Sequence, residues 1–290
     1  MLTDPGQLPR TPESALAGRS RLGLGGSGGR ALLIAAVSTA LFFGVVGFII
    51  VSSPGWPSVR RSFFDPQVFA ESWPRILPGF LINVELFLIA EVLILGLGLV
   101  LAVLRSLPGP VFFPVRLLAT IYVDLFRALP GVLIIFMLGF GAPALRIKGL
   151  PSDPFFWAVV ALTLLYSAYV SEVYRAGIES VHPSQDMAAR SLGMTRFQSL
   201  RSVVVPQAVR RVIPPLLNDF IGLQKDTVLI SFIGVVEIFR ASQIRQAATF
   251  NFTPYVVTAL VFLVVTIPLA RLTDYLAGRE ARRRLGGALR

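Results

Sequence analysis

The chain has very little of the chemistry on which most enzymes and metal proteins depend. It contains no cysteine and one histidine, His182, among 290 residues. The lack of cysteine excludes disulfide bonds, thiolate metal sites and cysteine nucleophiles, and a lone histidine excludes a histidine metal cluster; we expect His182 to be an ordinary solvated loop side chain. Charged residues are also scarce, at 15% of the chain against roughly 25% in soluble domains.

What the chain has instead is long apolar runs, and 54% of its residues are hydrophobic. Because the hydrocarbon core of a membrane cannot satisfy backbone polar groups, apolar runs of about 20 residues are predicted to cross it as helices. We predict six such spans, at residues 31–52, 79–104, 120–145, 155–174, 213–238 and 255–275. The predicted fold class is therefore an all-α integral membrane protein with six transmembrane helices.

The placement of the charges indicates how the chain is oriented. The net charge is +11, but the arginines flank the apolar runs and do not line one aromatic-rich face, so nucleic acid is excluded as a partner. Most Lys and Arg residues fall on the side of the membrane that both termini share, which the positive-inside rule assigns to the cytosol. We expect residues 1–30 to be a disordered cytosolic tail and residues 277–290 to be a basic cytosolic tail.

The loop at residues 180–211 differs from the rest of the chain in composition, because it holds five arginines between Asp186 and Arg211 in the stretch DMAARSLGMTRFQSLRSVVVPQAVRR. Ser184 is predicted to cap a short helix, with Asp186 near its positive end. Gly193 is predicted to end that helix in a left-handed turn.

A second short helix is expected after this glycine, with Phe197, Leu200 and Val204 on one face and an interruption at Pro206. Ala188 and Ala189 are small enough to let a partner's surface approach the backbone. The residues alone leave two interpretations open: a docking site for a partner protein, or an amphipathic pair lying on the lipid surface.

Several polar side chains fall inside or at the ends of the predicted spans. They are Asn83, Glu85, Glu91, Asn218, Asp219, Lys225, Asp226 and Glu237. Ionised groups at mid-bilayer are costly, so these should face the bundle interior or water. Lys225 either pairs with Asp226 or Glu91 for structural reasons or lines a substrate pathway. Near the loop, Glu172 and Arg175 are expected to form a local i, i+3 pair.

Residues 167–239 carry the most specific pattern: AARSLG, then VVVPQAVRR, then LQKDT. This pattern resembles the permease subunits of ATP-binding cassette importers, in the branch that takes up polar amino acids such as histidine, glutamine, glutamate and arginine. The resemblance covers residues 76–276. The family has Glu-Ala-Ala, then a glycine and a later proline, and Ala188, Ala189, Gly193 and Pro206 stand in those places. Met187 replaces the glutamate, with Asp186 one position earlier.

The resemblance implies a five-helix importer core, with the helix at 31–52 peripheral, in a bacterial cytoplasmic membrane. It implies that the loop at 180–211 forms a coupling helix that docks on a cytosolic ATPase subunit through Asp186, Met187, Ala188, Ala189, Ser191, Leu192, Gly193, Arg196 and Pro206. It further implies two ATPase copies, a second permease subunit and an extracytoplasmic substrate-binding protein. The chain has no GxxxxGK[ST] sequence, so ATP and its magnesium would be bound by the partner. We therefore expect no cofactor in this chain and no enzymatic activity of its own.

Two rival classes of protein remain for comparison. A secondary transporter or channel driven by an ion gradient would use Glu91, Asp219 or Glu237, and would work without an ATPase. A membrane-embedded hydrolase would need histidine, cysteine or paired carboxylates near the end of a span, which the sequence does not offer.

Overall fold

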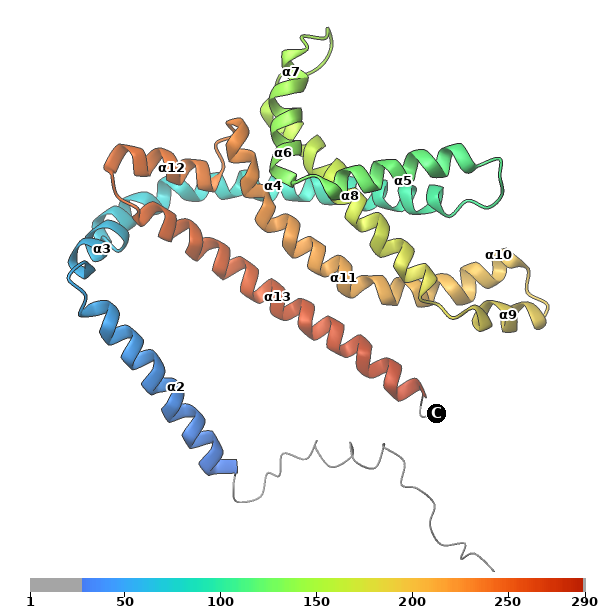
Figure 1. Cartoon of the computed structure of the whole chain (residues 1–290), viewed down its shortest axis with the longest axis horizontal. Helices are drawn as coiled ribbons and strands as arrows, with labels where there is room; N and C mark the ends of the chain where they lie inside the picture. The colour runs from blue at the N-terminus through green and yellow to red at the C-terminus, as the bar shows by residue number, and fades with distance from the viewer. Residues whose placement is uncertain (1–27, 289–290) are drawn as a thin grey trace, which may run out of the picture. The chain divides into compact units, whose positions relative to one another are not determined.

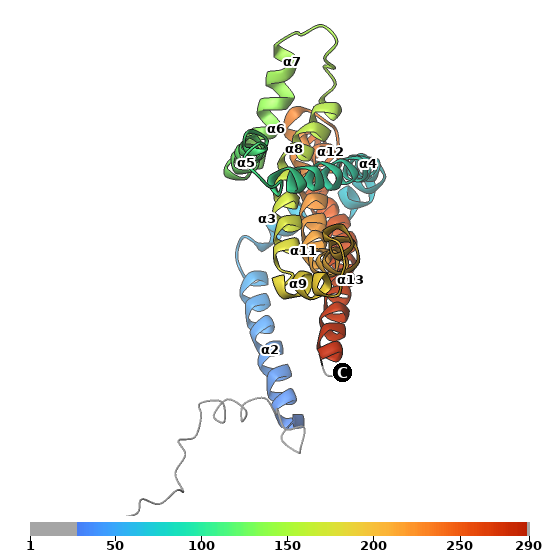
Figure 2. The same ribbon diagram turned by 90° about the vertical axis from the view of Figure 1, so that its right-hand side faces the viewer.

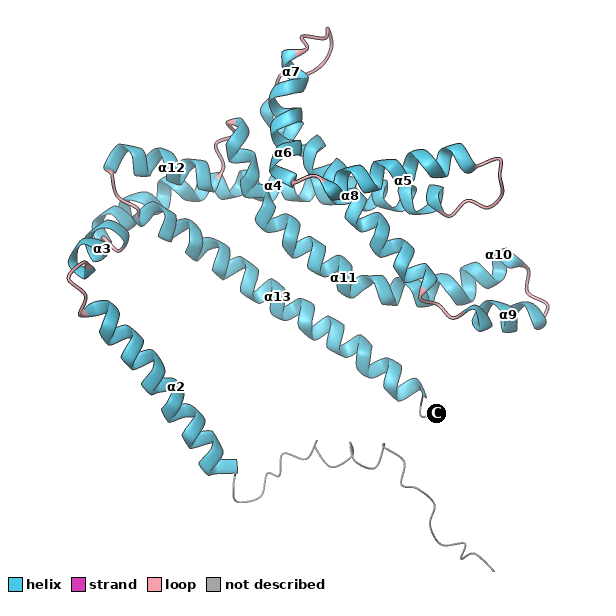
Figure 3. Ribbon diagram, in the orientation of Figure 1, coloured by secondary structure: helices cyan, strands magenta, loops and turns pink. Residues whose placement is uncertain are grey.

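The structure of the chain is a computed structural model that describes the backbone of residues 28–288 and the side chains of residues 29–279. The described residues form helices joined by loops and turns, with no strand among them (Figures 1 and 3). They divide into two units, residues 1–59 and 60–290. Each unit is described by itself.

In the first unit, the helix α2 (Gly28–Val51) corresponds to the first predicted span. Its residues Gly29–Val51 are long and apolar enough to cross a membrane, and none of the most apolar window is buried. Residues 28–30, predicted to end the disordered tail, already belong to α2, whereas residues 1–27 lie outside the described residues. A short helix, α3 (Trp56–Phe63), crosses the boundary between the units.

The second unit is built on two long helices, α4 (Pro66–Arg105) and α8 (Pro154–Glu179). Each begins with an aspartate followed by proline: the side chains of Asp65 and Asp153 accept hydrogen bonds from the first free amides, which a helix leaves without partners. The two helices pack closely because Gly98 has no side chain; a Cβ there would lie 2.7 Å from Val170 Cγ1. In the described part of the chain, four helices could cross a membrane, or up to six if each bent pair is one span.

The third predicted span, at 120–145, is not one straight helix but a bent pair of helices, which together are long and apolar enough to form one span. The chain forms α5 (Phe113–Ala128) and then α6 (Gly131–Phe136), the π-helical turn η1 (Met137–Gly141) and α7 (Ala142–Ala144). The second part turns by 106° from the first, and α6 and α7 rise away from α5 (Figures 1 and 2). The break falls at Leu129, whose backbone is extended with ψ of 138°, since the ring of Pro130 disfavours helical geometry in the preceding residue.

The fifth predicted span, at 213–238, is also divided. The helix α11 (Val205–Asp226) begins before it, continues into the 3-10 helix η3 (Thr227–Ile233), and stops at Gly234, whose φ is +92°. The next helix, α12 (Ile238–Thr249), is bent by 50° from that segment. Glu237 therefore stands at a helix junction and not inside a regular span.

The last helix, α13 (Thr253–Ala288), covers the sixth predicted span and continues into the predicted tail at 277–290. Buried apolar side chains of α4, α8 and α11 form the main core, and a smaller cluster joins α4, α12 and α13 through Ile76, Ile238 and Val257. This arrangement leaves the α8–α11 connection free to extend beyond the bundle (Figure 1).

Candidate functional site: the α8–α11 loop and the polar groups of the spans

The loop begins with helix α9 (Pro183–Ser191), which is capped by His182 and not by Ser184 as predicted. His182 has extended backbone angles, and its Nδ1 accepts from the Ser184 amide at 3.2 Å. Pro183 takes the first helical position, where the missing N–H costs nothing. Asp186 lies in the first turn, as the sequence predicts.

Gly193 ends this helix in the left-handed conformation, with φ of +85°, and this prediction is confirmed. The Met194 amide donates to the Ala189 carbonyl at 3.3 Å, and the Gly193 amide donates to the Arg190 carbonyl at 3.0 Å. These bonds satisfy carbonyls that the end of a helix would leave open. No heavy atom lies near a Cβ built on Gly193, so the constraint here is the backbone conformation and not space.

The second helix, α10 (Arg196–Ser199), starts with a reciprocal capping box between Thr195 and Gln198. It passes without a break through the π-helical turn η2 (Leu200–Val204) into α11. Pro206 was expected to interrupt this helix, and that expectation was wrong. The wider π turn precedes the proline, where its ring would otherwise clash with an α-helical carbonyl.

The two short helices are tied to each other by buried contacts. The Ser199 hydroxyl donates to the Asp186 carboxylate at 2.6 Å, and Ala189 is buried, with 5% of its surface exposed. The Asp186 carboxylate is thus engaged inside the loop. Of the two alanines expected to face a partner, only Ala188 is exposed, because Ala189 points into the contact between the helices.

The outer face of the loop carries large apolar side chains that nothing in the described chain covers. The exposed fractions are 60% for Met187, 85% for Leu192 and 69% for Phe197. Ser191 and Arg196 are exposed beside them. The loop lies at the ends of α8 and α11, far from α12 (Figure 1). Apolar side chains gathered on a projecting loop mark a surface that another molecule covers.

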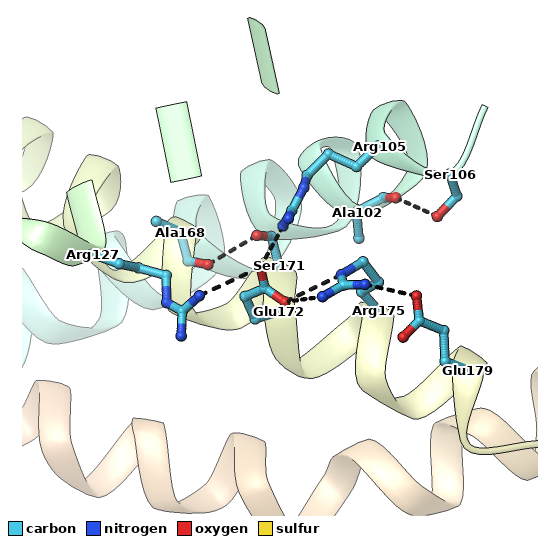
Figure 4. Close-up of polar contacts among 9 residues, drawn as sticks. All are labelled: Ala102, Arg105, Ser106, Arg127, Ala168, Ser171, Glu172, Arg175 and Glu179. Carbon is cyan, nitrogen blue, oxygen red and sulfur yellow. Dashed lines mark hydrogen bonds and ion pairs between the residues drawn. The ribbon is translucent and has the colours of Figure 1, made fainter. Parts of the chain in front are cut away.

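The base of the loop is held by a cluster of charges around Glu172 of α8 (Figure 4). Its carboxylate contacts Arg105 at 2.6 Å, Arg175 at 2.9 Å and Arg127 at 3.5 Å. Arg175 also bonds Glu179 at 2.8 Å. The predicted Glu172–Arg175 pair is present, but Arg105 comes from α4 and Arg127 from α5. The sequence could not show these partners, since they are distant in the chain.

A cavity of about 550 Å³ lies beside this cluster, between α8 and α11. Arg211 donates to the Ser180 carbonyl at its edge, and Val212 leaves no room for a side chain at Gly177. The two helices that enter and leave the loop are therefore in direct contact at its base.

Among the polar groups of the spans, Asn83 and Glu237 are brought together. The Asn83 amide nitrogen donates to Glu237 Oε2 and to Thr227 Oγ1, both at 3.1 Å, and its oxygen accepts from the Ile238 amide at 3.2 Å. Glu237 also caps α12 by accepting from the amides of Phe239 and Arg240. These two residues join α4, η3 and α12, which is a structural role.

The other polar groups are arranged differently. Tyr166 donates to the Asp226 carboxylate at 2.8 Å, whereas Asp219 keeps one buried carboxylate oxygen without a hydrogen-bond partner. Lys225 makes no ion pair within the described chain, so the predicted pairs with Asp226 and Glu91 are not formed. Glu85, Asn218 and Lys225 are exposed, and Glu91 is half-buried. The described residues include no group of three His, Cys, Asp or Glu that could hold a metal ion.

Comparison with known protein families gives one match that covers most of this unit. The model of the family described as "Binding-protein-dependent transport system inner membrane component" matches residues 94–282. That interval contains α8, the α8–α11 loop, α11 and α12.

Two relatives from Bacillus subtilis (strain 168) are similar over most of their lengths. The probable glutamine ABC transporter permease protein GlnM is 39% identical over 184 residues, covering 63% of this chain and 82% of the relative. The arginine transport system permease protein ArtQ is 32% identical over 197 residues, covering 68% and 88%. A solved structure described as an amino acid ABC transporter with histidines has a TM-score of 0.68 at 30% identity, covering 74% of this chain and 98% of that one.

Proposed function

The chain belongs to the family of binding-protein-dependent transport system inner membrane components, and on this premise we propose that it is a permease subunit of an ATP-driven importer of a polar amino acid. It is a multi-pass protein of the inner membrane, with both termini in the cytosol. The similar permeases for glutamine and arginine support the substrate class. ATP is hydrolysed by a separate subunit, present in two copies, to which this chain is mechanically connected.

The observation that carries the proposal is the exposed apolar face of the α8–α11 loop. Met187, Leu192 and Phe197 are held outward by a loop whose interior bonds fix its shape. This surface fits a cleft in the ATPase subunit, where Ala188 lets the partner approach the backbone. The Asp186 carboxylate is engaged with Ser199, so the coupling contact rests on apolar packing more than on a carboxylate.

Movement of the loop reaches the membrane helices through its base. Glu172 joins α8 to α4 and α5 through Arg105 and Arg127, so a displacement of α8 acts on both of these helices at once. ATP binding can shift the inward-outward equilibrium only by its differential contact energy, and a change from 1:99 to 99:1 needs about 5.5 kcal/mol. Burial of several apolar side chains at two such loops supplies energy of this order, at about 1.5–3 kcal/mol for each side chain.

The exposed polar face of α11 is an argument that a second permease subunit covers it in the assembled transporter. Asn218 and Lys225 are two turns apart on one face and are both exposed, although lipid tails would leave them unsatisfied. A second permease subunit would enclose this face in a water-filled pathway. There Lys225 would attract the carboxylate of an amino acid. Its ammonium group would be attracted by Glu91 or by Asp219, which has one carboxylate oxygen without a hydrogen-bond partner. An extracytoplasmic binding protein would deliver the substrate to the opposite end.

The ion-gradient alternative has less support, because Glu237, one of its three candidate carboxylates, is fully occupied in capping α12 and bonding Asn83. It predicts transport that continues without the ATPase and follows the proton or sodium gradient.

Single cysteines test the proposal directly, since the chain has none of its own. We expect Ala188→Cys and Leu192→Cys to crosslink to the ATPase subunit in the assembled complex. Ala189→Cys is the matched control. Ala189 is next to Ala188 but is buried, so a cysteine at this position should not crosslink. Labelling of Leu192→Cys only by lipid-borne reagents would support the lipid-surface interpretation and would contradict the proposed docking.

A further inference from the structure

A second cavity, of about 530 Å³, lies where α4 ends and α5 begins, on the side that faces the end of α8. Its polar walls are formed by Arg105, Ser106, Arg116, Thr120, Arg175 and Glu179. Arg105 and Arg175 also contact Glu172 at the base of the α8–α11 loop, whereas Ser106, Arg116 and Thr120 belong neither to that loop nor to the polar groups of the spans. The cavity therefore adjoins the base of the loop, but it offers groups that the proposed transport cycle does not use.

The walls of this cavity carry one arginine, Arg116, that makes no ion pair in the described chain, and they offer unused hydrogen-bond donors; the charge of Arg105 is neutralised by Glu172. Glu179 is neutralised by Arg175 at 2.8 Å. Arg105 uses Nη1 for Glu172, and Arg116 uses Nη1 for the carbonyls of Leu107 at 2.6 Å and Gly109 at 2.8 Å. A guanidinium has five N–H donors, and in the described chain the remaining donors of Arg105 and Arg116 have no hydrogen-bond partner. Two guanidinium groups with free donors at one cavity suit a phosphate oxygen cluster.

An apolar strip on α5 continues outward from the cavity. Leu118, Ile121 and Leu125 lie on one face of the helix at i, i+3 and i+7, and each is more than half exposed. Leu117 lines the cavity itself, so polar and apolar surfaces meet at the mouth. A soluble anion would use only the arginines, whereas a molecule with an anionic head and hydrocarbon chains would cover both surfaces.

We propose that this cavity binds the phosphate headgroup of an anionic phospholipid, with the acyl chains lying along the exposed face of α5. Basic pockets between helix ends hold such headgroups by the same combination of charge and apolar contact. The proposed function enters only in the choice of leaflet, because the cavity lies on the same side of the membrane as the α8–α11 loop. A bound lipid there would brace the ends of α4 and α5 against α8.

The test compares the thermal stability of the full chain in nanodiscs of phosphatidylcholine with increasing phosphatidylglycerol. We expect phosphatidylglycerol to raise the unfolding temperature in a saturable manner. Arg116→Gln should weaken the apparent lipid affinity by about fivefold, since one arginine near an anionic surface contributes about a factor of this size, and Arg116→Lys should restore most of it. Thr120→Phe, which fills the cavity without changing charge, should abolish the saturable part.

Arg201→Gln is the matched control, because Arg201 is exposed on the proposed cytosolic side and lies outside the cavity; it should leave the affinity unchanged. Equal effects of Arg201→Gln and Arg116→Gln, or no difference between the two lipids, would overturn the proposal. Equal stabilisation by inorganic phosphate in neutral lipid would also overturn it, because the ligand would then be a soluble anion. Loss of the lipid effect when a partner subunit occupies the cavity would overturn it as well. Each of these results leaves the crosslinking test of the coupling loop intact.

Discussion

At the scale of single residues, Glu172 takes part in more ion pairs than any other residue that the structure describes. One carboxylate serves three arginines from three helices, and its strongest partner, Arg105, is only 10% exposed. A charge this close to the interior needs a counter-charge, because removing one member of a buried pair leaves the other without compensation. Glu172 therefore stabilises the bundle chiefly by neutralising Arg105.

Glu172→Gln should lower the free energy of unfolding by roughly 2 kcal/mol, less than the 3–5 kcal/mol seen for fully buried pairs, because Arg127 and Arg175 remain partly solvated. Thermal unfolding in detergent measures the loss. Glu179→Gln is the control, since that carboxylate is 61% exposed and such pairs contribute about 0–1 kcal/mol. Equal losses in the two variants would show that the cluster is not a stabilising centre.

At the scale of the elements, the α8–α11 loop depends on the left-handed turn at Gly193. A β-branched residue at φ of +85° is strained by about 1–2 kcal/mol, and relieving the strain would turn α9 away from α10. Gly193→Val should abolish substrate-stimulated ATP hydrolysis by the assembled transporter while the chain still inserts. Gly193→Asn should keep most of the stimulation, because asparagine tolerates this conformation. Full stimulation in the valine variant would contradict the coupling role of the loop.

The close contact between α4 and α12 at Gly79 leads to a second prediction at this scale. A Cβ on Gly79 would lie 2.7 Å from the Ile238 backbone nitrogen, and backbone cannot move aside as a flexible side chain can. Gly79→Ala should destabilise the chain by about 1–3 kcal/mol through overpacking, measured as a lower unfolding temperature. Gly96→Ala is matched in chemistry but has open space around it, and it should be neutral or slightly stabilising. A neutral Gly79→Ala would mean that this junction opens readily.

How far the sequence predicts these elements depends on whether the signal is local. The turn at Gly193 and the place of Asp186 in the first turn of α9 were predictable, because helix ends select their residues within one or two turns. The cap at His182 was missed, since histidine is not a favoured capping residue. The contact of Asn83 with Glu237 was also missed, because it joins segments far apart in the chain. The burial of Ala189 beside exposed Ala188 was missed because it depends on how α9 packs against α10.

At the scale of the whole molecule, the described chain leaves polar groups of its spans uncovered. Lys225 is exposed and has no ion pair within the described residues. This is what we expect of a subunit whose polar face is covered by a second subunit in the assembly. Neutralising it therefore distinguishes a structural role from a role in transport.

Lys225→Met should change the unfolding temperature very little, within the roughly 0.5 kcal/mol typical of surface substitutions, but should reduce amino-acid uptake by reconstituted transporters. Lys148→Met, an exposed lysine in a loop, should alter neither. The reverse pattern, lower stability with normal uptake, would place Lys225 in a structural pair within the assembly.

The 106° corner between α5 and α6 also affects the surrounding bilayer. The last carbonyls of α5 and the first amides of α6 have no partners in their own helices, and hydrocarbon offers them none. At this corner the backbone must border water or protein, and part of the protein is the chain's own α8, since a Cβ on Gly131 would lie 2.7 Å from Leu165 Cδ2. A bend of this kind is consequently a point at which the chain has to be shielded from hydrocarbon by protein or water.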